Sequence, residues 1–74
     1  MKVGDQVGWQ WGNGLATGEV REIRHDRTQI ESKGKIITRN GRDDDPAIVI
    51  AGDSGSTILK LAHEVQVIQG GTNV

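Results

Sequence analysis

Three short stretches carry residue types that could do chemistry. Residues 52–55 (Gly-Asp-Ser-Gly) copy the tetrapeptide around a serine-protease nucleophile, but that reaction also needs a base and an orienting acid on a much larger scaffold. Residues 43–45 are three aspartates, whose consecutive carboxylates splay apart and lack the alternating ligands of a Ca²⁺ site. His25 and His63 have no cysteine to complete a zinc site. The sequence therefore predicts a hairpin turn at residues 52–55 and no catalytic site, metal or cofactor.

The two tryptophans are the only Phe, Trp or Tyr side chains in the sequence. Trp9 is predicted to fill the core, because a small barrel needs a large inward side chain. Trp11 stands at the mouth of the first predicted hairpin, where its flat ring would offer a contact surface beside Asn13. The alternative is that Trp11 caps one end of the barrel. Trp11 and Asn13 are thus the candidate ligand-binding residues.

A basic band is the second candidate surface. Seven of the nine basic residues lie between residues 21 and 42, against three acidic ones in the same stretch. A face lined by part of this set would contact phosphates in a salt-dependent way. Platforms for single strands add several stacking aromatics, however, and the band has none, so a solvated charged face is the simpler interpretation. The candidate nucleic-acid contacts are Arg21, Lys33, Lys35 and Arg39.

Length and charge bound the remaining possibilities. With 74 residues there is room for one domain, and the net charge of -1 predicts no general attraction to nucleic acid or to an anionic membrane. The longest uninterrupted apolar run, residues 47–51, is far shorter than the roughly 20 residues of a membrane span. The expected location is the cytoplasm, with no membrane association.

The positioning elements are predicted to be short strands. Val7, Trp9 and Trp11 are two apart, so a strand would direct them to one face. The Asn-Gly pair at residues 13–14 tolerates positive φ at both centres of a tight turn. The first strand is therefore predicted to end near Trp11 and the second to begin near Leu15.

A second hairpin is predicted further along. Residues 47–51 are mostly β-branched and lie between a proline and a glycine, which favours a strand with Ile48 and Ile50 directed inward.

The partner strand of that hairpin covers residues 56–61. Because Lys60 prefers water, Leu59 and Leu61 are predicted to share the core face, with Ile58 outside.

The segment between the two hairpins is less regular. Val20 and Ile23 are three apart, which breaks strand alternation. This spacing predicts either a bulge near Arg21 and Glu22 or the exposure of one of the two apolar residues. Gly34 predicts a turn or kink. If Ile36 faces the core, Ile37 faces solvent.

The whole chain is predicted to be all-β. Five or six short antiparallel strands with glycines at the corners favour a small barrel, which also removes exposed sheet edges. Residues 62–64 could form a single helical turn before a short strand at residues 65–68. Residues 1–69 are predicted to be one barrel domain, and residues 70–74 a flexible C-terminal tail.

Several motifs in this order resemble the hypervirulence-associated Tudor-like domain family. They are Gly4-Asp5-x-Val7-x-Trp9, Gly18-x-Val20, Gly34-Lys35-x-Ile37-Thr38-Arg39-Asn40, Asp45-Pro46-Ala47-x-Val49-Ile50 and Leu59-Lys60-x-x-x-Glu64-Val65. The resemblance runs from Val3 to Ile68. It implies a small SH3-like barrel and leaves the activity open.

Methylated lysine or arginine is not the predicted ligand. Such cations are held by several convergent aromatic faces, and two tryptophans on one strand cannot wall such a cage. The sequence favours a non-enzymatic module that binds a protein partner through the mouth of its first hairpin. Salt-dependent nucleic-acid binding through the basic band is the alternative, and homodimer formation through a strand edge stays open.

Overall fold

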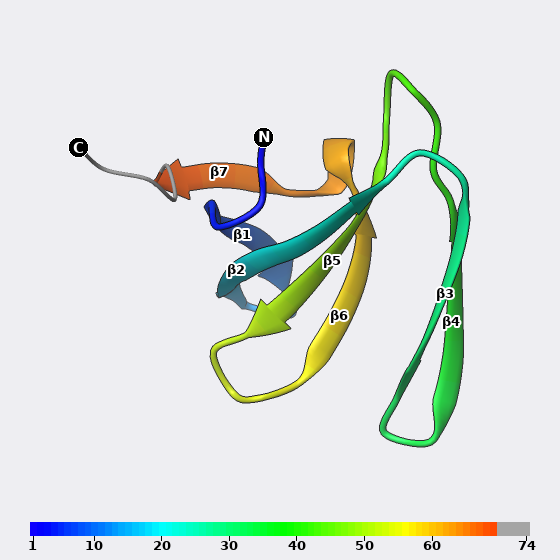
Figure 1. Ribbon diagram of the computed structural model, residues 1–74. Helices are drawn as coiled ribbons and strands as arrows, with labels where there is room; N and C mark the ends of the chain where they lie inside the picture. Colours follow the sequence, from blue (N-terminus) through cyan, green and yellow to red (C-terminus); the bar gives the residue numbers. More distant parts are fainter. Residues whose placement is uncertain (70–74) are drawn as a thin grey trace.

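The computed structural model describes residues 1–69, which form seven strands and one short 3-10 helix (Figure 1). The strands are β1 (Gln6–Trp11), β2 (Gly14–Arg24), β3 (Arg27–Ser32), β4 (Lys35–Asn40), β5 (Ala47–Gly52), β6 (Thr57–Leu61) and β7 (Gln66–Gln69), and the 3-10 helix is η1 (Ala62–Glu64). The all-β prediction is confirmed, with seven strands where five or six were expected. Among the described residues no helix is long and apolar enough to cross a membrane. The predicted tail, residues 70–74, lies outside them.

Two antiparallel sheets make up the fold. Five strands pair in the order β6-β5-β2-β1-β7, while β3 and β4 pair only with each other. The five-stranded sheet curves strongly, and η1 carries the chain from β6 at one edge to β7 at the other (Figure 1). The β3–β4 hairpin stands beside β6. The arrangement is a small barrel with one added hairpin.

The main core lies inside the curve of the five-stranded sheet. Val7 and Trp9 of β1 alternate with polar residues and glycine, so both side chains point inward. Ile48 and Ile50 are fully buried in the same cluster, which confirms the inward direction predicted for them. The other buried members are Val20 and Val65.

Of the two alternatives for Val20 and Ile23, the structure shows the bulge, which lies in β2. Val20 pairs with Ile50 and Glu22 pairs with the next residue of β5, Val49. Arg21 is therefore an extra residue on β2 that has no pairing partner on β5. That extra residue restores Ile23 to the core side, where it packs against the main cluster. The bulge thus explains the three-residue spacing of the two apolar residues, and bulges of this kind increase the bend of a strand.

A second core lies on the other face of β5. Ala47, Val49 and Leu59 form a separate buried cluster, against which Ile30 and Ile37 of the β3–β4 hairpin pack. Because this hairpin covers the face that would otherwise meet water, β5 is buried on both sides.

The second core corrects the faces predicted for β6. Ile58 was expected outside, but it lies opposite Ile50 and packs against the main core. Leu59 lies opposite Val49 and belongs to the second cluster. Leu61 packs against the same second cluster, so Leu59 and Leu61 do share a core face as predicted. The prediction for Ile58 was wrong because it assumed that only one face of the hairpin is buried.

The β3–β4 hairpin also differs from its expected orientation. Ile36 is 72% exposed, whereas Ile37 packs against the second core. The turn itself lies where Gly34 predicted it. Lys33 and Gly34 have φ values of 54° and 78°, as the central residues of a tight two-residue turn require.

The first hairpin turns one residue earlier than predicted. Trp11 pairs with Gly14, so the two central residues are Gly12 and Asn13 rather than residues 13–14. Only Gly12 has a positive φ, of 55°. A glycine at the first central position is typical of the type II′ turn. The prediction from the Asn-Gly pair did not consider this turn type.

An Asp45–His63 contact ties the loop before β5 to η1. The backbone N–H of His63 donates to Asp45 Oδ1 at 2.9 Å, and His63 Nδ1 lies 2.6 Å from Oδ2. The hydrogen bond from His63 holds the pKa of Asp45 below its usual range. The Asp45–His63 contact therefore stabilises the fold fully at pH values above the ordinary aspartate pKa. This stabilisation is lost as the pH falls through the lowered pKa of Asp45.

We expect the Asp45 carboxyl to report this contact directly. In a ¹³C NMR titration its midpoint should lie below about 3.9, the ordinary aspartate value. In His63→Ala the midpoint should rise toward that value, in part only, because the backbone bond remains. A midpoint that His63→Ala leaves unchanged would show that the imidazole is not the cause.

Candidate functional site

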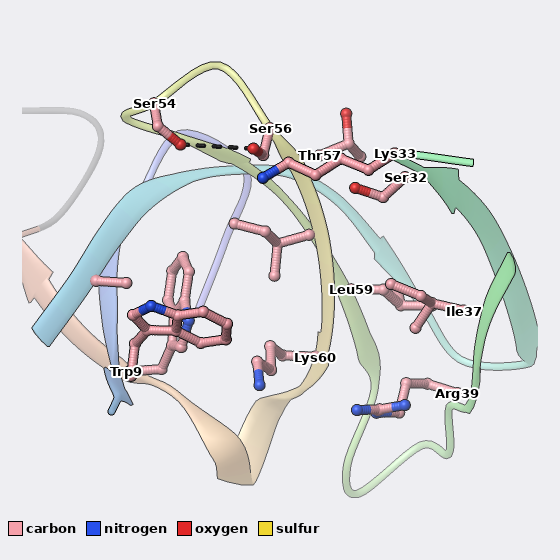
Figure 2. A pocket seen from close by; sticks show the side chains of 13 residues that line it. Trp9, Ser32, Lys33, Ile37, Arg39, Ser54, Ser56, Thr57, Leu59 and Lys60 are labelled. Atoms are coloured by element: carbon pink, nitrogen blue, oxygen red, sulfur yellow. Dashed lines mark hydrogen bonds between the residues drawn. The ribbon is translucent and has the colours of Figure 1, made fainter. Parts of the chain in front are cut away.

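A groove of about 410 Å³ lies between the two hairpins (Figure 2). The β1–β2 hairpin forms one wall, the β3–β4 hairpin forms the other, and β6 runs between them. Its apolar lining residues are Trp9, Trp11, Ala16, Ile37, Ile58 and Leu59, and its polar ones are Ser32, Lys33, Arg39, Ser54, Ser56, Thr57 and Lys60. The groove is therefore an apolar trough with hydroxyl and cationic groups along it.

The tryptophan wall combines an anchored ring with an accessible one. Trp9 is 6% exposed and Trp11 is 73% exposed, although strand alternation places both on the same side of β1. Trp9 lies opposite Ala16, whereas Trp11 is the last residue of its strand, so the core ends before reaching it. The predicted role of Trp11 at the hairpin mouth stays a prediction, but its ring is accessible. Asn13 lies in the turn and does not line the groove.

The floor of the groove follows the edge of β6. Five consecutive residues, 56–60, line it, although neighbouring side chains of a strand point to opposite faces. Ile58 belongs to the main core and Leu59 to the second. The groove therefore runs along the strand edge where the two cores meet. A strand rises about 3.3 Å per residue, so these five residues span about 13 Å, enough for a short extended peptide.

The polar part of the lining is positively charged. Lys33, Arg39 and Lys60 line the groove, and none of the lining residues is an aspartate or glutamate. Figure 2 shows Lys33 beside Thr57 at one end, with Lys60 and Arg39 toward the other.

Glu64 sits just outside the groove and neutralises part of that charge. Arg39 Nε lies 3.4 Å from Glu64 Oε1. Burial raises the pKa of Glu64, but the hydrogen bonds from the Leu61 backbone N–H, at 2.7 Å, and from Arg39 together bring it below the usual range. Glu64 is thus ionised at neutral pH. Within residues 1–69, Lys33 and Lys60 make no ion pair.

The structure separates the four basic residues that the sequence grouped. Lys33 and Arg39 line the groove, but Lys35 is exposed outside it and Arg21 lies on β2 beside Glu19, at 3.8 Å.

Lys60 joins the groove although the sequence analysis did not select it. Lys60 is two residues from Ile58, so both side chains point to the same face of β6. In the sequence analysis Lys60 served only to assign that face to solvent.

The stretches that first looked catalytic have structural partners. Asp53 accepts a hydrogen bond from the Thr17 hydroxyl and its backbone N–H donates to the Thr17 carbonyl at 3.1 Å. Ser54 Oγ lies 3.5 Å from Ser56 Oγ, as Figure 2 shows. The turn that they form fixes one end of the groove.

Two of the three consecutive aspartates, Asp44 and Asp45, have different partners. Asp44 accepts from Arg42 Nε and Nη2, both at 3.2 Å, and the guanidinium lowers the pKa of that carboxyl. Asp45 is held by His63, as described above. Across residues 1–69 no group of three His, Asp or Glu side chains is placed to hold a metal ion.

Comparison with known proteins identifies a family. Residues 4–65 match the family described as hypervirulence associated proteins TUDOR domain, in agreement with the resemblance carried by the sequence motifs. No curated protein and no protein of known structure gives a significant match.

Proposed function

This chain belongs to the family of hypervirulence-associated TUDOR domains, and we propose that it is a non-enzymatic interaction module. A segment of a protein partner binds in the groove between its two hairpins, with Trp11 as the main contact. The observation that carries the proposal is the position of Trp11, an indole 73% exposed at the mouth of an apolar groove.

The physical reason is the surface that Trp11 leaves in water. An aromatic ring beside an already buried one gives a partner a large apolar area at little cost in side-chain entropy. Tryptophan is enriched among residues that dominate interfaces, where truncation typically costs about 2 kcal/mol or more. The neighbouring Trp9 is held by the core, so one side of the groove is already formed before a partner arrives.

The charge of the groove argues against a methylated ammonium ligand. Cation-binding cages combine aromatic faces with a carboxylate, whereas this groove carries Lys33, Arg39 and Lys60 and no carboxylate among its lining residues.

Ion pairing weakens the case for nucleic acid as the partner. Four of the five arginines, Arg21, Arg24, Arg39 and Arg42, lie within 4 Å of a carboxylate oxygen. A phosphate would have to compete with these carboxylates for the guanidinium groups. We therefore place a protein segment first.

A peptide selection tests the proposal. The immobilised protein, Trp11→Ala and Ile36→Ala would each be used to select from a phage library of random dodecapeptides. Ile36 is the matched control, because its exposure of 72% is close to the 73% of Trp11 and it lies outside the groove. For a synthetic peptide selected by the wild type, Trp11→Ala should weaken binding by about 30-fold, the equivalent of about 2 kcal/mol. Ile36→Ala should change it less than about twofold.

Two outcomes would contradict the proposal. One is a selection in which no sequence is enriched above a blank surface. The other is a set of peptides that bind Trp11→Ala as tightly as the wild type. Thermal unfolding would check the fold of both variants. Substitutions at exposed positions should change the free energy of unfolding by no more than about 0.5 kcal/mol.

A further inference from the structure

We infer that the occupant of the groove is an acidic peptide, an extended segment in which one apolar side chain lies between two carboxylates. This inference rests on the proposed function and specifies the chemistry of the partner. It depends on the charge of the groove and on the order in which its groups lie along β6.

The positive charge of the groove is a local property. The chain as a whole has a net charge of -1, yet the groove is lined by three cations and no carboxylate. Arg39 shares its charge with Glu64, at 3.4 Å. Lys33 and Lys60 make no ion pair within 4 Å among the described residues, although the charge of Lys60 also acts on Glu64. One carboxylate just outside the groove thus faces the charges of both Arg39 and Lys60, and the net positive charge beside the apolar walls favours an anionic ligand and disfavours a cationic one.

The cations lie toward opposite ends of an apolar section. Lys33 is in the turn of the β3–β4 hairpin and lies beside Thr57, whereas Lys60 is three residues further along β6 (Figure 2). Three strand residues span about 10 Å. Ile58 lies between Thr57 and Lys60 along β6, and the two tryptophans line the groove from β1.

An extended peptide can match this order. Residues two apart in an extended chain point to the same side and are separated by about 6.6 Å. A segment with the pattern acid-x-apolar-x-acid would therefore place its apolar side chain against Trp11 and Ile58. Its two carboxylates, about 13 Å apart, would reach the flexible lysine side chains at either end. The hydroxyls of Ser56 and Thr57 are available to its backbone.

Synthetic peptides and charge-reversed proteins test the inference. The probes are three acetylated and amidated peptides, Gly-Asp-Ser-Leu-Ser-Asp-Gly and the same peptide with Asn or Lys in place of both Asp residues. Blocked ends ensure that only side-chain carboxylates are tested. Binding would be followed by ¹H–¹⁵N NMR titration of the wild type, of Lys33→Glu with Lys60→Glu, and of Lys2→Glu with Lys35→Glu. The last pair makes the same charge change outside the groove.

The acidic peptide should bind at least tenfold more tightly than the Asn and Lys peptides. Its shifts should centre on the Trp11 indole and on β6. The Lys33/Lys60 reversal should weaken it by at least tenfold, because attraction becomes repulsion at both ends, while the Lys2/Lys35 reversal should change it less than about threefold.

Other results would overturn the inference and can be told apart from failure of the proposed function. If peptides require Trp11 for binding but show no preference for acidic residues, the proposed protein-binding function stands and the inference of an acidic ligand fails. Equal losses from both double reversals would indicate general charge attraction. A decathymidylate that binds through the same residues at least as tightly as the acidic peptide would assign the groove to nucleic acid instead.

Discussion

Gly18→Ala should destabilise the protein by about 3 kcal/mol, at the upper end of the usual cost of overpacking. A Cβ at residue 18 would lie 2.6 Å from the backbone carbonyl oxygen of Ala51 and 2.6 Å from Ile50 Cγ2. The carbonyl belongs to the adjacent strand β5 and cannot move without disturbing the sheet pairing. For a domain of this size such a loss lowers Tm by roughly 12 °C or more.

Gly14→Ala is the matched control, because it makes the same change in the same strand. The nearest atom to a Cβ at residue 14 is the Trp11 carbonyl oxygen, at 3.9 Å. The added methyl therefore meets ordinary contact, and the reduced freedom of the unfolded chain should offset any loss. Thermal unfolding of the two variants measures the contrast. If Gly18→Ala and Gly14→Ala had equal Tm values, the close approach of β2 to β5 would not exclude a Cβ at residue 18.

Trp9→Ala should cost about 3–5 kcal/mol, comparable with the whole stability of a small domain. Trp9 is 6% exposed and packs in the main core, so its removal leaves a cavity that five short strands cannot close. Trp11→Ala is the control for this change, with an expected effect of about 0.5 kcal/mol or less. The two substitutions remove the same side chain from the same side of one strand and differ only in burial.

Urea unfolding followed by far-ultraviolet circular dichroism would measure the difference. If Trp9→Ala is unfolded in water, Trp9→Phe provides a smaller truncation whose midpoint should still lie below that of Trp11→Ala. A Trp11→Ala variant that loses as much stability as Trp9→Ala would mean that Trp11 closes the end of the barrel. Its assignment as a binding residue would then fail.

The main core could be read from the sequence because its signal is local. The alternation of Val7 and Trp9, and of Ile48 and Ile50, requires only that a strand has one buried face. The three-residue spacing of Val20 and Ile23 likewise has a local cause, the bulge.

The faces of β6 could not be predicted in this way. Ile58 and Leu59 are both apolar and adjacent, so their order does not say which faces which core. The answer depends on a second layer, the β3–β4 hairpin, packed against the outer face of β5. Which distant segment covers a strand is a property of the whole fold.

The candidate site was predictable to a similar extent. Trp11 followed from its place at the end of β1. The assembly of Lys33, Arg39 and Lys60 depends on the packing of the β3–β4 hairpin beside β6, a strand with which it does not pair. A count of basic residues along the sequence instead grouped Lys33 with Arg21, which the fold places at a separate site.

The separate pairing of β3 and β4 means that side chains alone hold one wall of the groove against the other. No strand pairing within residues 1–69 joins this hairpin to the five-stranded sheet. Apolar side chains such as Ile30 and Ile37, together with the Arg39–Glu64 ion pair, keep it in place. A ligand that touches both walls would therefore add its own contacts to those that fix the position of the hairpin.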